Sequence, residues 1–281
     1  MTPNADPLRL ALEVGLYVFF FLLFLWLFVL SGIAGLVGAW MASALGTCAA
    51  AVVANVLTLH IYEGRRLADV GCRWSSASAH NLAWGLAGGV GGALAVLGVP
   101  LATGAASLQP GPEGHLRTLL FVAVVLAFGA AGEEVLFRGY GFQLLLRSIG
   151  PYATILPVGV MFGLMHVSNP NASKLGLVNT AGFGVLFGYA FLRSRDLWLP
   201  FGLHYGWNLT LPLFGASVSG IKMGVTGCEL QWSARPIWSG GEYGPEASIL
   251  TSGVLVALFA FLWKAPIRAQ PNRLLDECAE K

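Results

Sequence analysis

Charged residues are scarce in this chain. Its 281 residues include 16 Lys and Arg and 14 Asp and Glu, so 11% are charged while 56% are hydrophobic. Because a soluble globular chain carries roughly 25% charged residues, this composition excludes both an ordinary soluble enzyme and a disordered protein. The formal net charge is only +2. We therefore expect no nucleic-acid partner, which would call for a strongly basic surface.

Cysteine is sparse, whereas glycine is abundant. The four cysteines are scattered without a CxxC pair, at Cys48, Cys72, Cys228 and Cys278, so they indicate neither a thiol-redox motif nor a cysteine zinc site. The 37 glycines are typical of membrane helices. The Gly-rich stretch 85–98 has no Lys and follows no strand, so we interpret it as a close-packing helix face and not as a phosphate-binding loop.

Long apolar runs dominate the chain. A spanning helix needs about 20 mostly apolar residues. The runs predict an all-α, polytopic membrane protein, with about eight transmembrane helices in one bundle, at 10–31, 33–59, 81–103, 116–146, 152–167, 175–192, 197–216 and 247–263. The run 116–146 is too long for one straight span, and we expect its second half to be tilted or interfacial. The first run is expected to be a retained signal anchor.

The basic residues predict the orientation in the membrane. With eight crossings and the N-terminus in the cytoplasm, eleven basic residues lie inside, at Arg9, Arg65, Arg66, Arg73, Arg147, Arg193, Arg195, Lys264, Arg268, Arg273 and Lys281. Four lie outside, at Arg117, Lys174, Lys222 and Arg235. We therefore expect an integral, multi-pass membrane protein with both termini in the cytoplasm, in the plasma membrane if the host is bacterial.

Six polar residues lie where lipid should be. They occur in three short blocks, AGEEVLFRGYG, FGLMH and HYGWN, at Glu133, Glu134, Arg138, His166, His204 and Asn208. A charged side chain at mid-bilayer costs about 2.5–3.5 kcal/mol on insertion scales, so these residues need a functional reason. Glu133 and His166 each lie 14 residues from the inner end of their span. If the helices pack together, we expect the six groups to converge within the membrane.

Spacing along each helix predicts how these groups are used. Glu134 and Arg138 are four residues apart, where helical side chains meet, and should form an ion pair because either charge alone is costly. Glu133 is displaced by about 100° around the helix and stays free. A free carboxylate with a His nearby suits a general base that activates water.

The remaining pair suits the stabilisation of an oxyanion. His204 and Asn208 are also four residues apart, so both point at one place and can donate to a developing negative charge. The residues therefore predict hydrolysis of an acyl bond, with Glu133 and His166 holding the water. Two His and one Glu also form zinc sites with an open position. This leaves a divalent metal such as zinc, bound by Glu133, His166 and His204, as an open alternative.

The three blocks resemble a known family. EEVLFR matches the EExxxR motif of the CPBP (CAAX protease and bacteriocin-processing, or Abi) membrane proteases, FGLMH matches their FxxxH motif, and HYGWN matches HxxxN, in the same order. RRLADVGCR also resembles a short block that precedes the core in the family. The resemblance covers residues 116–216 and relates the chain to type II CAAX prenyl endopeptidases.

The resemblance implies roles for the six residues. Glu133 would be the water-activating carboxylate with His166 beside it, His204 and Asn208 would form the oxyanion site, and Glu134 and Arg138 would support them. The family is commonly called a metalloprotease family, although a metal-free glutamate mechanism has also been argued for it. The partners expected are the lipid bilayer and a membrane-bound protein or peptide substrate.

The resemblance also divides the chain into regions. We expect an N-terminal region of three spans (1–115), a catalytic core (116–216), and an outer loop, last span and cytoplasmic tail (217–281). Two other functions stay open at this stage. One is a non-catalytic immunity or scaffold protein, since some family members act in bacteriocin self-immunity. The other is a transporter that relays protons through its intramembrane carboxylates and His residues.

Overall fold

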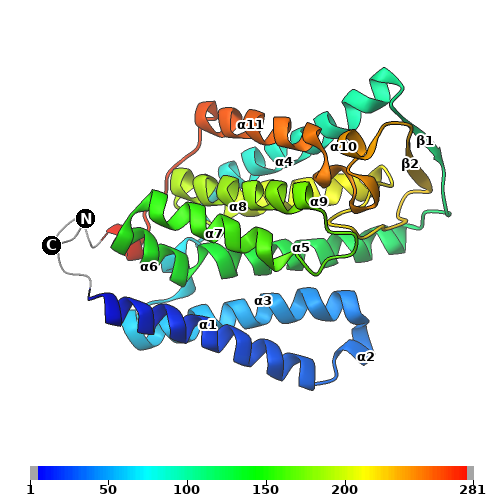
Figure 1. Cartoon of the computed structure of the whole chain (residues 1–281). Coiled ribbons are helices and arrows are strands. Elements are labelled where there is room, and N and C mark those ends of the chain that lie inside the picture. Colours follow the sequence, from blue (N-terminus) through cyan, green and yellow to red (C-terminus); the bar gives the residue numbers. More distant parts are fainter. Residues whose placement is uncertain (1–5, 277–281) are drawn as a thin grey trace.

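The computed structural model describes residues 6–276 and is almost entirely helical (Figure 1). Cys278 and Lys281 therefore lie outside the described residues. The α-helices are α1 (Pro7–Leu30), α2 (Ala34–Val37), α3 (Ala39–Thr58), α4 (Ser76–Thr103), α5 (Leu116–Arg138), α6 (Tyr140–Ile149), α7 (Pro151–Met165), α8 (Lys174–Ser194), α9 (Trp198–Leu213), α10 (Pro236–Ser239), α11 (Ile249–Lys264) and α12 (Arg273–Asp276). The described residues also contain two strands, β1 (Ala106–Pro110) and β2 (Cys228–Trp232), a π-helical turn at Leu59–Glu63, and short 3₁₀ helices at Leu67–Val70, Gly241–Tyr243 and Pro245–Ala247. The predicted all-α class is confirmed.

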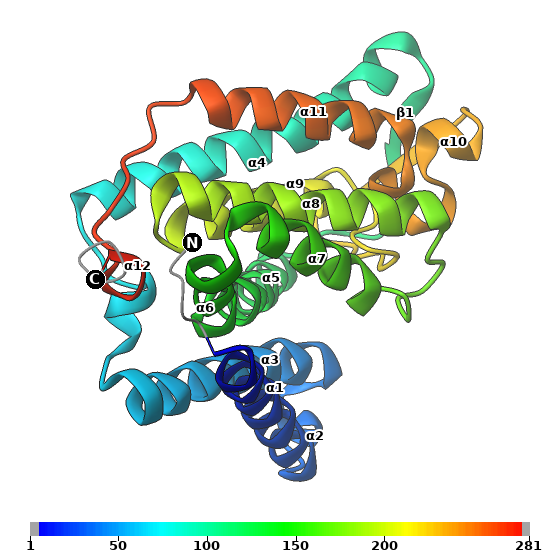
Figure 2. The ribbon, with the colours of Figure 1, turned by 60° about the vertical axis from the view of Figure 1, so that its left-hand side comes forward.

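The long helices form three layers (Figures 1 and 2). The helices α1 and α3 form the first layer, α5 to α9 form the middle layer, and α4 and α11 form the third. The middle layer contains all three sequence blocks that carry the intramembrane polar residues. It is therefore covered by helices on both sides, and those residues are held away from bulk lipid.

Five helical segments are long and apolar enough to cross a membrane, at Pro7–Leu30, Ala39–Glu63, Ser76–Thr103, Leu116–Ile149 and Lys174–Ser194. The helices α7 and α11 are apolar but shorter, and α9 has 16 residues. The eight predicted spans all coincide with helices, but within residues 6–276 only five helical segments are both long and apolar enough to cross a membrane. The outward-facing surface agrees with a lipid environment, since large apolar residues such as Trp26, Val160 and Val256 are more than half exposed.

The predicted long span 116–146 is broken at Gly139, where α5 ends and α6 begins. Asn55 of α3 fills the break: its side-chain oxygen accepts from the Tyr140 N–H at 2.7 Å, and its amide donates to the Val135 carbonyl at 3.1 Å. A side chain at Gly139 would meet the Asn55 oxygen at 2.2 Å, so only glycine fits there. Asn55 is thus an interhelical hydrogen-bonding residue, and it fixes the end of the helix that carries both glutamates.

The Gly-rich stretch is a close-packing face, as predicted. A Cβ at Gly85 would meet the Leu199 carbonyl at 2.4 Å, and one at Gly89 would meet the Leu203 carbonyl at 2.2 Å. The backbones of α4 and α9 are therefore in direct contact, as small residues permit between membrane helices. This crossing fixes the position and rotation of α9, which carries His204.

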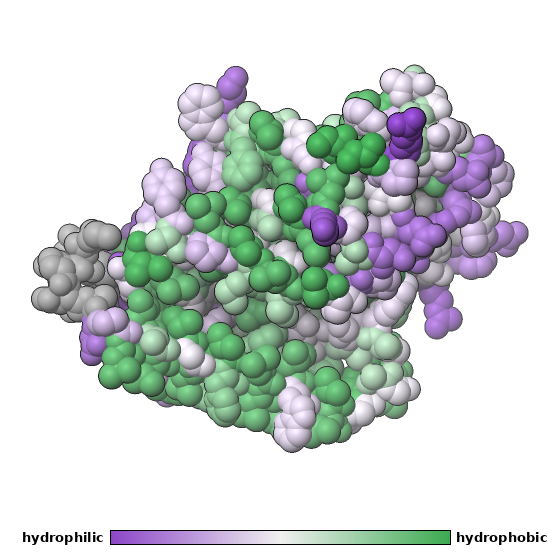
Figure 3. All heavy atoms as spheres, viewed as in Figure 1, coloured by the Kyte–Doolittle hydropathy of each residue, from purple (hydrophilic) through white to green (hydrophobic). Residues whose placement is uncertain are grey.

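The end of the molecule opposite α12 contains features that the sequence did not predict. The strands β1 and β2 pair antiparallel, with Leu108 opposite Leu230. The outer loop that begins the predicted region 217–281 comprises residues 217–246; it folds back on the bundle and buries Tyr243 and Glu246. Hydrophilic residues gather over this end in the space-filling view, whereas apolar residues cover most of the helical face (Figure 3).

Candidate active site

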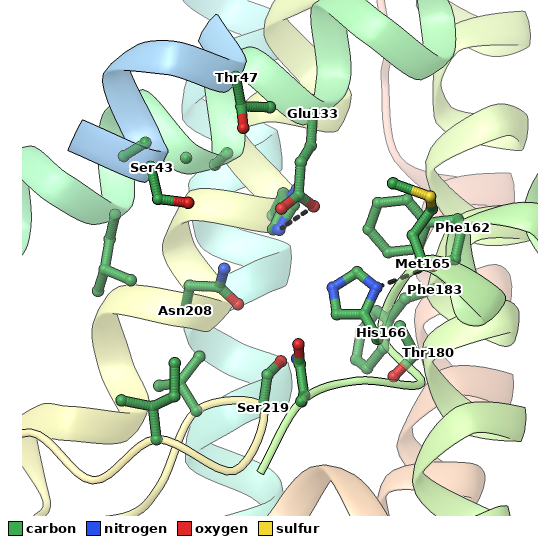
Figure 4. A pocket seen from close by; sticks show the side chains of 18 of the residues that line it. Ser43, Thr47, Glu133, Phe162, Met165, His166, Thr180, Phe183, Asn208 and Ser219 are labelled. Carbon is green, nitrogen blue, oxygen red and sulfur yellow. Dashed lines mark hydrogen bonds and ion pairs between the residues drawn. The ribbon is translucent and has the colours of Figure 1, made fainter. Parts of the chain in front are cut away.

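A cavity of about 370 Å³ lies within the bundle. Four of the six predicted site residues line it and two do not. Glu133, His166, His204 and Asn208 line the cavity, and Figure 4 shows Glu133, His166 and Asn208 pointing into it. Glu134 and Arg138 are completely buried behind it. The structure thus brings the three blocks together, as expected from their depths.

Glu133 presents a free carboxylate to the cavity. It lies one turn before the end of α5, and its side chain is 30% exposed. Its Oε2 atom is buried without a hydrogen-bond partner and lies 3.8 Å from Nε2 of His204. A buried oxygen without a partner is costly unless a water molecule or a substrate group completes it. The cavity offers space for either.

Glu134 holds a buried charged network. Its Oε1 atom lies 3.4 Å from a terminal nitrogen of Arg138, which is the predicted ion pair. The same oxygen accepts a hydrogen bond from Nδ1 of His204 at 2.9 Å. The other terminal nitrogen of Arg138 donates to the Gly184 carbonyl of α8 at 2.7 Å. One carboxylate therefore connects the helix that carries Glu133 to the helix that carries His204.

His204 is fixed on every side. Its Nδ1–H donates to Glu134, so in the neutral ring Nε2 carries the free lone pair and faces Glu133. The ring stacks on Phe187 of α8 with centroids 4.8 Å apart. Phe162 of α7 meets it edge-on at 5.9 Å. The sequence predicted His204 as a partner of Asn208 alone and missed its bond to Glu134, which comes from another helix.

His166 lies directly after the last residue of α7 and is half-buried. Its Nδ1 atom is 2.8 Å from the Phe162 carbonyl. A carbonyl only accepts, so the proton sits on Nδ1, and Nε2 of the neutral ring is a free acceptor. Figure 4 shows the ring across the cavity from Glu133. We expected His166 to lie directly beside Glu133. In the structure, His204 is the histidine that contacts the Glu133 carboxylate.

Asn208 follows His204 by one helical turn, as the sequence predicted. Its side-chain amide points into the cavity from α9 (Figure 4). The amide can donate two hydrogen bonds and accept two. A group placed between Glu133 and Asn208 is therefore within reach of an acceptor on one side and a donor on the other.

The three candidate metal ligands do not form a metal site in this arrangement. Within residues 6–276, no three His, Cys, Asp or Glu side chains come close enough together to hold a metal ion. Glu133 and His204 are neighbours, but His166 faces them from the far wall. The donor set therefore does not fit the zinc site that the sequence left open, and we derive no chemical step through a metal.

Glu246 is a charged cavity residue that sequence analysis did not single out. Glu246 lies immediately before α11 in the folded part of the outer loop, is only 6% exposed and lines the cavity. Its position at the start of an apolar run was the only sequence signal. An acidic residue in a loop outside the membrane is ordinarily solvated, so this signal alone does not indicate a buried site residue.

The comparison with known families agrees with this geometry. Residues 115–210 match the family model described as type II CAAX prenyl endopeptidase Rce1-like. This segment is similar to that family. The match begins just before α5 and ends within α9, so it contains all six residues of the three blocks. No curated protein matches the chain. This similarity and the five apolar helices among the described residues together indicate an integral membrane protein related to the CAAX-type intramembrane endopeptidases.

Proposed function

We propose that this protein is an intramembrane endopeptidase that hydrolyses a peptide bond of a membrane-associated protein or peptide. The observation that carries the proposal is the buried Oε2 of Glu133, which has no hydrogen-bond partner and faces a cavity beside His204. A carboxylate so placed accepts a proton from a water molecule in the same cavity. The similarity of residues 115–210 to the type II CAAX prenyl endopeptidase model supports the reaction class.

The reaction follows from the groups on the cavity wall. Water bound at Glu133 attacks the scissile carbonyl carbon, and its proton passes to the Glu133 carboxylate. The carbonyl oxygen becomes an oxyanion, to which the Asn208 amide donates. The tetrahedral intermediate then collapses: the C–N bond breaks, and the proton held by Glu133 passes to the leaving amine. Each half-reaction is balanced, and Glu133 ends as it began.

Both histidines act through the nitrogen that faces the cavity. In His166, the Phe162 carbonyl fixes the proton on Nδ1, so Nε2 accepts a hydrogen bond from the attacking water. In His204, Nδ1–H is used by Glu134. Donation from its Nε2 to the oxyanion therefore requires a ring protonated on both nitrogens. Glu134 and Arg138 touch no reacting atom in this scheme and position His204.

The location of the substrate follows from the cavity. It opens among helices that carry lipid-facing residues, so we propose that the substrate is itself held in the bilayer. The excess of basic residues on one set of connections supports cytoplasmic termini. We propose accordingly that the segment 217–246 lies on the outer side of a plasma membrane.

The test uses the full chain in liposomes with membrane-anchored peptides. Glu133→Ala and His166→Ala are expected to abolish cleavage while insertion and folding are retained. Glu242→Gln is the matched control, because Glu242 is exposed and does not line the cavity. Cleavage by Glu133→Ala at the wild-type rate would remove the proposed mechanism. A wild-type protein that binds partners but cleaves none would favour the immunity or scaffold alternative.

A further inference from the structure

A tight turn of the outer loop forms one wall of the catalytic cavity. Val218, Ser219 and Ile221 line the cavity with Asn208 and His166. The turn is closed by two backbone hydrogen bonds of 2.9 Å each, between Val218 N and Ile221 O and between Ile221 N and Val218 O. Figure 4 shows the Ser219 side chain directed into the cavity near Asn208. The position of this turn therefore sets the width of the cavity.

The turn adopts a conformation that its sequence does not favour. Ser219 has φ +49°, in the left-handed region that non-glycine residues rarely adopt. Such a residue persists only where surrounding contacts hold it. Gly220 has φ +84°, and a Cβ there would meet the Pro170 carbonyl at 1.9 Å. The turn is thus pressed against the segment that follows His166, and something must hold Ser219 in place.

Glu246 supplies that contact. One carboxylate oxygen accepts from the Ser219 backbone N–H and, at 3.1 Å, from the Ser219 hydroxyl. The other oxygen accepts from Nε1–H of Trp207 at 3.1 Å. Trp207 is the residue before Asn208 on α9 and is buried against Phe183, with ring centroids 4.6 Å apart. Glu246 therefore fastens the turn to the helix that carries His204 and Asn208.

The donors around Glu246 require a carboxylate. Two of them, the Trp207 indole and the Ser219 backbone amide, can only donate, and they face different oxygens of Glu246. A glutamine amide has one oxygen and one NH₂ group. Whichever way the amide of a Glu246→Gln variant turns, its NH₂ faces one of these donors. Neutralisation therefore breaks one of the two contacts although size and shape are preserved.

We propose that Glu246 is a specificity-determining positioning residue, which holds the 218–221 turn as a fixed wall of the substrate cavity. The inference rests on the proposed function, because this wall limits which substrate side chains next to the scissile bond fit beside Asn208. Glu246 also lines the cavity, but both of its carboxylate oxygens are used by Ser219 and Trp207, so its role is to position these two residues.

The first experiment measures hydrogen exchange of residues 217–223 in the full chain, which does not depend on catalysis. Glu246→Gln is expected to speed exchange there by about 10-fold, as loss of a hydrogen bond to a charged group implies. Trp207→Phe removes the indole N–H, which is the other group that donates to residue 246. In the double variant, the glutamine side-chain oxygen is therefore free to accept from the Ser219 backbone N–H. The double variant is therefore expected to return exchange to near the wild-type rate. Equal exchange in wild type and Glu246→Gln, or no rescue in the double variant, would overturn the proposal.

The second experiment separates KM from kcat on a membrane-anchored peptide. Glu246→Gln is expected to raise KM by about 10-fold, to leave kcat within about twofold of wild type, and to admit bulkier residues at the cleavage site. A fall in kcat at unchanged KM would contradict the proposal that the 218–221 turn acts as a wall of the substrate cavity. If Glu246→Gln fails to fold, Ser219→Ala removes only the hydroxyl bond and should give a smaller change in the same direction. A wild-type protein that cleaves nothing, with the exchange result intact, would reject the proposed function and not the anchoring of the turn.

Discussion

His204 and Glu134 are 70 residues apart in the sequence and share a 2.9 Å hydrogen bond inside the bundle. The same glutamate oxygen contacts Arg138. Glu134 therefore serves two partners, one on its own helix and one on α9. The free neighbour, Glu133, faces the opposite nitrogen of the same His ring. Two adjacent glutamates thus hold one histidine between them: Glu134 is buried and contacts His204 and Arg138 through one oxygen, whereas Glu133 is open to the cavity.

This arrangement predicts that Glu134 contributes more to stability than Glu133. Glu134→Gln leaves Arg138 as a buried charge without its partner, and breaking such a pair costs about 3–5 kcal/mol. Chemical denaturation of the purified protein in detergent measures the decrease in the free energy of unfolding. Glu133→Gln is the matched control because its carboxylate is 30% exposed and has no cationic partner among the described ion pairs other than His204. Equal stability of the two variants would contradict the network.

Asn208 is predicted to affect the chemical step. Removing one donor to an oxyanion costs about 10²–10³ in kcat. Asn208→Ala should therefore lower kcat by that factor and leave KM nearly unchanged, because the amide acts only once the negative charge develops. The measurement is steady-state cleavage in liposomes. A rise in KM at constant kcat would place Asn208 in substrate binding instead.

The crossing of α4 and α9 is predicted to depend on single glycines. At Gly89 a new Cβ would lie 2.2 Å from the Leu203 carbonyl, so α4 and α9 must move apart in the Gly89→Ala variant. Overpacking of this kind typically costs 1–3 kcal/mol, and the shift of His204 should lower activity as well. Gly91 lies on the same helix with nothing within 4 Å, and Gly91→Ala is the control. Equal thermal unfolding temperatures for Gly89→Ala and Gly91→Ala would contradict the close contact between α4 and α9 at Gly89.

Thiol labelling tests the predicted orientation. Cys228 is exposed at the start of β2, so a membrane-impermeant maleimide should label it from outside intact cells in a Cys278→Ser background. Burial raises the pKa of the Cys72 thiol to about 11. Its reactive thiolate is therefore scarce at neutral pH, appears only as the pH approaches that value, and gives little labelling even in open membranes. Protection of Cys228 in intact cells, with labelling after lysis, would reverse the proposed topology.

Local spacing was sufficient to predict part of the site. Glu134 and Arg138 are four residues apart on one helix, and their contact follows from helix geometry alone. The separation of Glu133 from that pair follows from the same geometry. The helices themselves were predictable because the apolar runs are long, and the Gly-rich face of α4 was recognised from its composition.

Contacts between distant segments were not predictable in this way. No local pattern indicates that Glu134 meets His204 or that His166 faces Glu133 from across the cavity, because both depend on how three helices are rotated against each other. The outer loop was missed for a different reason. Its polar composition is typical of a solvated connection, yet Glu246 is buried by donors from Trp207 and Ser219, which only the folded chain brings together.

The most direct test of the account compares membranes that carry wild-type protein with membranes that carry Glu133→Ala, by mass spectrometry of peptide termini. With both proteins expressed at equal levels, we expect new termini within membrane-associated proteins only in the wild-type sample. Their sequences would identify the substrates and show whether cleavage lies near a C-terminus. The same set of termini in both samples would contradict the central claim that Glu133 activates water for peptide hydrolysis.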